Sequence, residues 1–145
     1  MTKTDTLVVN REAAQVDIRF VAPGLVTPDA SGAPRLIGGS CRKCQARSFP
    51  VAAVCTNCLS EDIAPVELPE QGILYSYSIV HQAPKGWAVP YALGYIDLPG
   101  DVRVLAHLDL PADKISIDMP MRLAVGVVGA DVSGAPLYSY TFKPV

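Results

Sequence analysis

The chain has 145 residues and a mass of 15.4 kDa, which allows one ordinary domain with a small one attached and excludes two large hydrophobic cores. Its net charge of -2 and pI near 5.6 argue against a general nucleic-acid binder, which needs a basic face for the phosphates. No apolar run reaches the roughly 18 residues that span a bilayer, and the first residues do not resemble a secretory signal. We therefore expect a soluble, cytoplasmic protein that makes no membrane contact.

Residues 1–37 are interpreted as an N-terminal arm. A strand is predicted over 16–21 (VDIRFV), and a loop rich in Pro, Gly and small residues follows it (APGLVTPDASGAPR). The arm has little core of its own. We expect it to pack on another chain, because apolar side chains such as Ile18, Phe20, Val21 and Leu25 are stabilised by such burial.

All four cysteines lie in the next stretch, with the spacing C-x2-C-x10-C-x2-C. Each C-x2-C pair can form a tight knuckle that points two thiolates at one ion, and two knuckles complete the tetrahedron that zinc prefers. Gly38 and Gly39 before the first knuckle, and Pro50 between the knuckles, suit the turns of a compact ribbon over 38–69. A closed site leaves no position for water, so we expect a structural Zn2+ held by Cys41, Cys44, Cys55 and Cys58.

Three other interpretations of the cysteines compete with zinc. Disulfides need an oxidising compartment, for which the N-terminus gives no signal. A thioredoxin-type redox pair needs a single C-x-x-C that opens a helix, whereas two pairs lie here among turn and strand residues. Iron in the same all-sulfur cage is not distinguished from zinc by spacing, so this alternative stays open.

Three cations, Arg42, Lys43 and Arg47, are the charged residues between Gly39 and Ser60. The predicted ribbon is therefore basic, although the chain as a whole is acidic. A solvated surface is the simpler interpretation, and contact with a phosphorylated ligand or an acidic partner is the functional one. The segment APVELP ends this region as a stiff linker.

Residues 70–145 consist of short apolar segments between turn signals. Alternation with a period of two is clear in the third segment, where Val102, Val104 and Ala106 oppose Arg103 and His107. Closure would remove the exposed edges of five strands, so we predict a mainly β chain that ends in a five-stranded OB-fold barrel. The predicted strands are Ile73 to Val80, Tyr91 to Leu98, Val102 to Leu110, Met121 to Val128 and Leu137 to Phe142.

The order of these features resembles a known family, the zinc-ribbon/OB-fold proteins encoded beside thiolases and acyl-CoA hydratases. The similar segments are SCRKCQARSFP, VCTNC, GILYSYSIVHQAP and the closing YTFKP, and the resemblance covers roughly residues 36–144. It implies a rubredoxin-like zinc ribbon followed by the OB-fold. It also implies an accessory subunit that joins a thiolase-fold or hot-dog-fold enzyme and helps it to handle acyl-CoA.

One departure from the family pattern concerns the N-terminus. Many members begin with a pair of helices that carry a Phe-Trp signature, and nothing in residues 1–37 matches it. This weakens a pairing with a hydratase and favours thiolase-associated members, including small subunits of thiolases for bulky or aromatic acyl-CoA. A partner of an acyl-CoA hydratase or aldolase is the alternative. A thiolase nucleophile is absent, because every cysteine belongs to the predicted metal site, so we expect a non-catalytic subunit of a hetero-oligomer.

The loop HQAPKGWAVP, between the first two barrel strands, carries the remaining candidates. Trp87 stands beside Lys85 in a Pro/Gly-rich segment, where it either contacts a ligand or partner or folds back over the barrel end. His81 ends the preceding strand, where a structural role is commoner than a chemical one, and His107 is expected to face outward without a function. The residues predicted to contact CoA or a partner are Arg42, Lys43, Arg47, His81, Lys85 and Trp87.

A second functional class is a single-strand nucleic-acid module, because OB barrels stack bases on aromatic side chains. Tyr75, Tyr77, Trp87 and Tyr91 supply aromatics, but residues 72–145 carry few cations for the phosphates. A stand-alone enzyme is the third class, and no catalytic constellation is assembled in the sequence.

Overall fold

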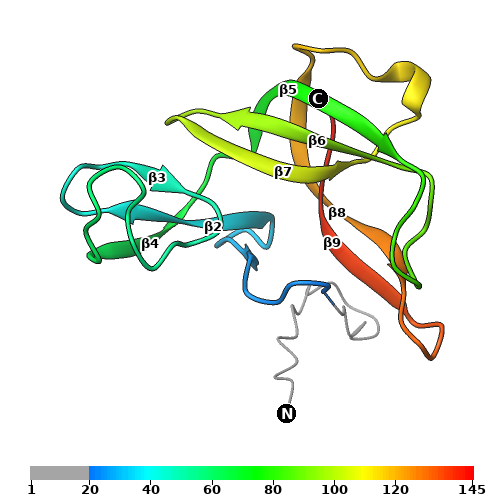
Figure 1. The fold of residues 1–145 in the computed structure, drawn as a ribbon, viewed down its shortest axis with the longest axis horizontal. Helices are drawn as coiled ribbons and strands as arrows, with labels where there is room; N and C mark the ends of the chain where they lie inside the picture. The colour runs from blue at the N-terminus through cyan, green and yellow to red at the C-terminus, as the bar shows by residue number, and fades with distance from the viewer. Residues whose placement is uncertain (1–19) are drawn as a thin grey trace.

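The computed structural model describes residues 20–145, which form two connected β-sheets (Figure 1). The first, the ribbon sheet, contains β1 (Val26–Pro28), β2 (Pro34–Cys41), β3 (Arg47–Ser48) and β4 (Ile63–Glu67). The second contains β5 (Gln71–Val80), β6 (Tyr91–Leu98), β7 (Val102–Leu108), β8 (Pro120–Ala130) and β9 (Pro136–Pro144), with the 3-10 turn η1 (Ala112–Lys114) before β8. In this part of the chain no helix is long and apolar enough to cross a membrane.

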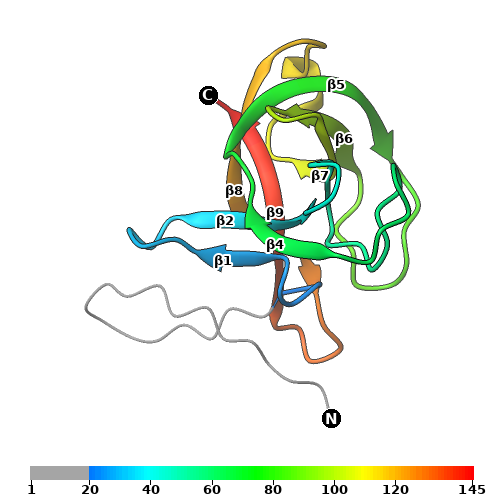
Figure 2. The same cartoon turned by 90° about the vertical axis from the view of Figure 1, so that its left-hand side faces the viewer.

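The barrel confirms the predicted fold class. All five predicted strands are present, and they differ from the prediction only at their ends. The strands close in the order β5-β6-β7-β9-β8, and Figure 2 shows β5 curving over β6 and β7. Strands β7 and β9 run parallel and complete the closure, with Leu108 opposite Phe142. Closure pairs part of the strand edges that an open sheet of five strands would leave free, over three residues between β5 and β8 and two between β7 and β9.

The hydrophobic core lies inside the barrel and continues under the ribbon sheet. Along β7 the burial alternates as predicted, with Val102, Val104 and Ala106 buried and Arg103 exposed. The same cluster of buried side chains includes Val26, Leu36 and Leu68 from the ribbon side. Ribbon and barrel therefore share one core.

The predicted N-terminal arm is partly built into this core. Strand β2 runs through the boundary predicted between residues 37 and 38, and Leu36 within it is fully buried. Phe20 forms a β-bridge with Tyr138 and packs on the core, because the barrel of its own chain already offers an apolar surface there. Ile18 and most of the predicted strand 16–21 lie outside the described residues. The three-part division of the chain stays a prediction.

A β-hairpin occupies the segment that was predicted to be a loop. Between β1 and β2, the Asp29 carboxylate accepts hydrogen bonds from the Ser31 hydroxyl (2.6 Å) and from the backbone N–H groups of Ser31 (2.8 Å) and Ala33 (3.1 Å), while Gly32 has a φ of +85°. The hydrogen bonds from Ser31 hold the pKa of Asp29 at about 2. The same letters, D-x-S-G-A-P, recur in the β8–β9 turn, where Asp131 accepts the equivalent bonds from Ser133 and Ala135.

The prediction that the two glycines before the first cysteine lie in a turn is wrong. Gly38 and Gly39 lie inside β2 and not in a turn. A Cβ atom at Gly38 would lie 2.5 Å from the carbonyl oxygen of Ser48 in β3, so the close approach of the two strands requires glycine. Pro50 does lie in the bend after β3, as predicted.

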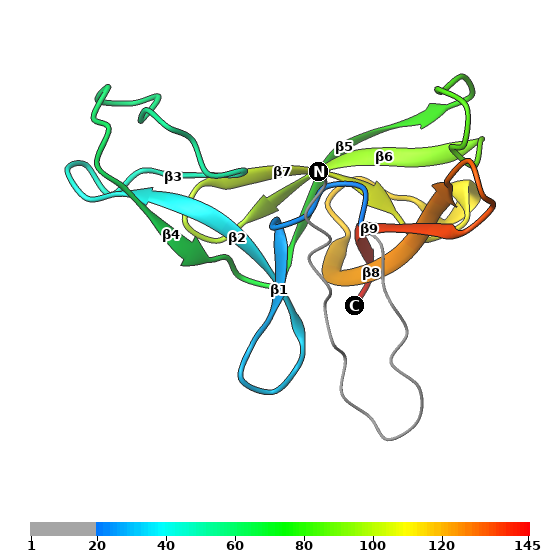
Figure 3. The same ribbon diagram turned by 90° about the horizontal axis from the view of Figure 1, so that it is seen from below.

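Two contacts fix the ribbon against the barrel. The Phe49 ring meets the Tyr140 ring of β9 edge-on, with 5.4 Å between the centroids, and the Tyr140 hydroxyl donates to the Leu105 carbonyl (2.9 Å). Burial raises the pKa of Tyr140. A Cβ atom at Gly100 would lie 3.3 Å from a guanidinium nitrogen of Arg47, so this ribbon side chain lies against the β6–β7 turn. Figure 3 shows the ribbon sheet extending to one side of the barrel.

Candidate functional site

The sulfur atoms of the four cysteines converge on one point. Cys41 ends β2, Cys44 follows in the next turn, and Cys55 and Cys58 form the second knuckle before β4. All four Sγ atoms lie within 4.8 Å of one another, with Cys41 and Cys58 3.6 Å apart and Cys44 and Cys55 3.5 Å apart. A tetrahedron with zinc–sulfur bonds of ~2.3 Å has sulfur–sulfur edges of about 3.8 Å. The arrangement therefore fits one tetrahedral ion with four sulfur ligands.

The backbone of the two knuckles is the same. In the first, the Gln45 N–H donates to the Cys41 carbonyl (2.9 Å), and in the second the Leu59 N–H donates to the Cys55 carbonyl (3.0 Å). Gln45 and Leu59 occupy equivalent positions and both have left-handed backbone, with φ of 67° and 63°. These turns point both thiols of each pair to the same side, so the backbone preorganises the sulfur cage.

The protonation chemistry of the cage favours a divalent cation. The Asn57 side chain and the Ala46 N–H lower the pKa of Cys44 to about 6. The Ser60 N–H favours the thiolate of Cys58, but burial and the three neighbouring sulfurs outweigh it and raise the pKa of Cys58 to about 12. Four adjacent thiolates repel one another unless a cation lies between them, and Zn2+ stabilises all four in the ionised form.

The three predicted ribbon cations, Arg42, Lys43 and Arg47, differ in whether they already contact other residues of the chain. Arg42 forms an ion pair with Asp62 (2.7 Å), because the Arg42 N–H also donates to the Asp62 carbonyl and aligns the two residues. Arg47 lies against the β6–β7 turn, and Lys43 is exposed. The positive charge of the stretch between Gly39 and Ser60 is thus partly neutralised by Asp62, which follows it in the sequence.

Trp87 folds back over the outside of the barrel, which was one of its two predicted positions. Its indole stacks on the His107 imidazole, with 5.5 Å between the centroids and 5° between the planes, and Tyr91 packs against both rings. The backbone of this loop is also bonded to β8, since the Ala130 N–H donates to the Gly86 carbonyl (2.8 Å). His107 faces outward as expected, but Trp87 and Tyr91 cover it.

Replacing Trp87 by Ala is expected to lower the free energy of unfolding by about 1–3 kcal/mol, because a half-buried aromatic ring and its stacking partners lose their contacts. Urea denaturation of the zinc-loaded protein measures the change. Tyr95→Ala, which removes an exposed aromatic ring, is the control and should have a smaller effect. Equal stability of Trp87→Ala and the natural chain would contradict the packing role.

The covered His107 predicts a pH dependence of stability. Burial lowers its pKa below the ordinary value of 6.5, and its Nε2 atom has no hydrogen-bond partner among the described residues. The unfolded chain therefore binds a proton more readily, so stability is lost as the pH falls below about 6.5. Urea denaturation at about pH 7.5 and pH 5.5 should show a smaller pH effect in His107→Gln than in the natural chain. His81→Gln, at an exposed position, should keep the full effect.

The predicted contact residues fall into two separate groups. His81 and Lys85 are exposed on the loop between β5 and β6 that also carries Trp87. Figures 1 and 3 show this loop at the end of the barrel away from the ribbon, which carries Arg42, Lys43 and Arg47. The structure therefore does not bring the six residues into one compact site.

Two family models match the chain in succession. The model described as ChsH2, rubredoxin-like zinc ribbon domain matches residues 30–64, and the model described as ChsH2, C-terminal OB-fold domain matches residues 65–126. The chain belongs to this zinc-ribbon/OB-fold family. The junction of the two matches falls within β4, the strand that leads from the ribbon into the barrel.

Similar proteins match most of this chain. "Benzoylsuccinyl-CoA thiolase subunit BbsA" of Thauera aromatica is 38% identical over 130 residues, 89% of this chain and 90% of that one. The protein of the same name from Geobacter metallireducens is 33% identical over 146 residues, 100% of this chain and 99% of that one. The solved structure named "Ltp2-ChsH2(DUF35) aldolase" has a TM-score of 0.61 at 29% identity and covers 76% of this chain and 84% of that one.

Membership of the zinc-ribbon/OB-fold family agrees with the sulfur geometry. Cys41, Cys44, Cys55 and Cys58 form a structural zinc site. Bound Zn2+ would have all four positions filled by sulfur, so its contribution is to hold the two knuckles together and not to activate water.

Proposed function

We propose that this chain is the accessory subunit of a thiolase-fold enzyme that acts on acyl-CoA esters, and that the two form a hetero-oligomer in the reducing cytoplasm. The observation that carries the proposal is the similarity to two proteins named as benzoylsuccinyl-CoA thiolase subunits over 89% and 100% of this chain. The four cysteines are all zinc ligands, so the reacting thiol of a thiolase has to come from the partner.

An apolar face on the barrel supports a subunit role. On the outer side of β5, β6 and β7, Ile73, Tyr75, Tyr95 and Leu105 are each between 41% and 53% exposed. Arg103 lies over the Tyr75 ring, 3.6 Å from its centroid, and its charge is paired by Asp97 at 2.6 Å. Aromatic residues and arginine are enriched in protein interfaces. We infer that this face, rather than a charged one, meets the enzyme.

The acyl-CoA contact is proposed for the ribbon cations. Lys43 is exposed, and Arg42 can leave Asp62 at little cost, because an ion pair between two side chains that are more than half exposed is worth only about 0–1 kcal/mol. Guanidinium and ammonium groups bind the phosphates of coenzyme A well. The loop between β5 and β6, which carries His81, Lys85 and Trp87, lies at the end of the barrel away from the ribbon (Figure 1). We therefore propose that these residues contact the partner rather than the same CoA molecule.

Co-purification tests the subunit proposal. The tagged chain is purified from its native cell extract, proteins that elute with it are identified by mass spectrometry, and the complex is reassembled from the purified components. We expect a thiolase-fold enzyme at stoichiometric level whose kcat/KM for acyl-CoA falls when this chain is removed. Elution of the chain alone, or with nucleic acid, would contradict the proposal.

Charge reversal tests the CoA contact separately. The triple substitution Arg42→Glu, Lys43→Glu and Arg47→Glu should weaken acyl-CoA binding to the assembled complex at least about tenfold, since three positive charges near the proposed phosphate position become negative. Lys114→Glu, at an exposed position of η1, is the control and should bind as the natural chain does. Unchanged affinity of the triple variant would remove the ribbon from the CoA site and leave the subunit proposal standing.

An aldolase is the alternative partner, because the solved relative named "Ltp2-ChsH2(DUF35) aldolase" shares the fold over 76% of this chain. The same co-purification distinguishes the two enzymes by the identity of the captured protein. A single-strand nucleic-acid module would instead show oligonucleotide binding that falls steeply with salt.

A further inference from the structure

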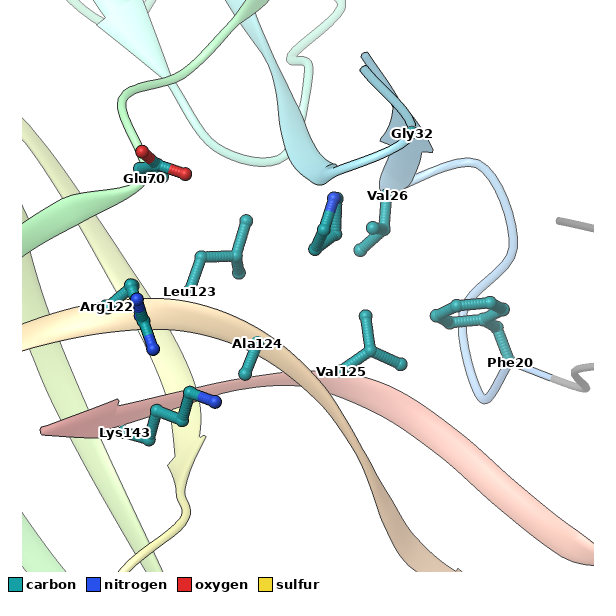
Figure 4. A pocket seen from close by; sticks show the side chains of 10 residues that line it. Phe20, Val26, Gly32, Glu70, Arg122, Leu123, Ala124, Val125 and Lys143 are labelled. Carbon is teal, nitrogen blue, oxygen red and sulfur yellow. The ribbon is translucent and has the colours of Figure 1, made fainter. Parts of the chain in front are cut away.

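A groove of about 420 Å3 lies between the β1–β2 hairpin and strands β8 and β9 of the barrel (Figure 4). Most of its wall is apolar: Val26 and Leu123 are buried side chains of the shared core, and Pro34, Ala124 and Val125 are half-buried. Known small-molecule sites have volumes of about 300–1,000 Å3 and similar apolar walls. The size and lining of the groove thus suit a small organic molecule.

Two positive charges line one end of the groove. Arg122 and Lys143 are direct partners in the antiparallel register of β8 and β9, so their side chains leave the sheet side by side. Like charges opposite one another destabilise a sheet. Among residues 20–145 no carboxylate forms an ion pair with either side chain, so the repulsion is not compensated within the described part of the chain.

The carboxylate at this end of the groove already has a partner. Glu70 accepts from Arg35 at 3.1 Å, and the Nε atom of Arg35 also donates to Asp29 at 3.0 Å. Arg35 is thus shared by two carboxylates, so Arg35, Arg122 and Lys143 together exceed Asp29 and Glu70 by one positive charge, which lies on the unpaired side of Arg122 and Lys143. Figure 4 shows these two side chains at the end of the groove away from Phe20, with Leu123, Ala124 and Val125 between.

We propose that the groove binds an amphipathic anion, a small molecule whose carboxylate or phosphate lies between Arg122 and Lys143 and whose apolar body lies along the half-buried Ala124 and Val125. The anion relieves the repulsion of the cation pair, and a guanidinium group binds either headgroup through two hydrogen bonds. The apolar body covers the parts of Ala124 and Val125 that are still exposed to water. This site belongs to the chain itself and does not depend on the identity of the partner enzyme.

Binding of simple probes to the isolated, zinc-loaded chain tests the proposal. Hexanoate and hexyl phosphate carry both required parts, whereas acetate and inorganic phosphate lack the apolar body, and hexanol lacks the charge. Two-dimensional NMR should show saturable shifts of the backbone amides of residues 122–125 and 143 with hexanoate or hexyl phosphate, and the tighter of the two identifies the headgroup. Equal binding of acetate, inorganic phosphate or hexanol, or no saturable binding of either amphipathic probe, would overturn the proposal.

Neutral substitutions of Arg122 and Lys143 test whether these two charges bind the anion. Arg122→Gln with Lys143→Gln should weaken hexanoate binding at least about tenfold, while Lys114→Gln, at an exposed position elsewhere, should leave it unchanged. The melting temperature of the double variant without probe should equal or exceed that of the natural chain, because repulsion is removed. Natural affinity in the double variant would refute the role of the pair. Failure to capture any enzyme from extract would bear on the subunit proposal alone.

Discussion

Replacing Cys41 by Ser is expected to abolish stoichiometric zinc binding and to remove most of the stability of the ribbon. Cys41 is buried at the end of β2, and a serine hydroxyl does not replace a thiolate as a zinc ligand. Structural zinc sites contribute about 10–16 kcal/mol of binding free energy in small peptides, which is as large as the whole stability of a typical domain. Metal analysis and thermal denaturation of the purified variant measure both effects.

The loss of zinc should also destabilise the barrel. Val26, Leu36 and Leu68 of the ribbon side share the core with the barrel strands, so an unfolded ribbon exposes part of that core to water. Thr56→Ala, at an exposed position that is not a ligand in the second knuckle, is the control and should retain one zinc per chain. A metal-free Cys41→Ser protein with the natural melting temperature would contradict a structural role for the ion.

Replacing Phe142 by Ala is expected to lower the free energy of unfolding by about 3–5 kcal/mol, the range for a large aromatic side chain removed from a packed core. Phe142 is fully buried in β9, where it lies opposite Leu108 on one side and Leu123 on the other. Its loss creates a cavity at the parallel pair that closes the barrel. Urea denaturation of the zinc-loaded variant measures the change.

Two further variants separate cavity formation from a general effect of substitution. Phe142→Leu keeps most of the apolar volume and should cost clearly less than Phe142→Ala. Tyr75→Ala removes an aromatic ring from the exposed face of the barrel and should cost less than either, since little buried volume is lost. A Phe142→Ala protein as stable as Tyr75→Ala would contradict the placement of Phe142 in the core.

The predicted contact residues lie on separate surfaces of the molecule. The ribbon cations and the loop with Trp87 lie at opposite ends of the molecule, and the apolar face of β5, β6 and β7 belongs to the barrel wall. One accessory subunit can thus use different surfaces for the enzyme and for a CoA ester. The charge reversal in the ribbon and the Trp87→Ala substitution lie far enough apart that their effects on stability should be additive.

Features that follow from local chemistry can be predicted from the sequence of this protein. The cysteine spacing predicts the zinc ribbon, the alternation at 102–108 predicts a half-buried strand, and turn residues mark the hairpins. The β1–β2 hairpin was missed although its signal was present, because the first copy of D-x-S-G-A-P was interpreted as part of a loop and not as the turn of a hairpin. In both copies the Asp side chain satisfies the backbone N–H groups of its own turn, a local interaction that needs no tertiary structure.

Contacts between side chains from distant parts of the chain could not be predicted in this way. Trp87 stacks on His107, Arg42 pairs with Asp62, and Arg122 lies opposite Lys143, although none of these pairs is adjacent in the sequence. Such neighbours depend on strand register and on the closure of the barrel. A period of two tells which face of a strand a residue occupies, but not what covers that face. The sequence therefore contained the zinc site in full, whereas the groove and the covered histidine arise only when distant strands pack together.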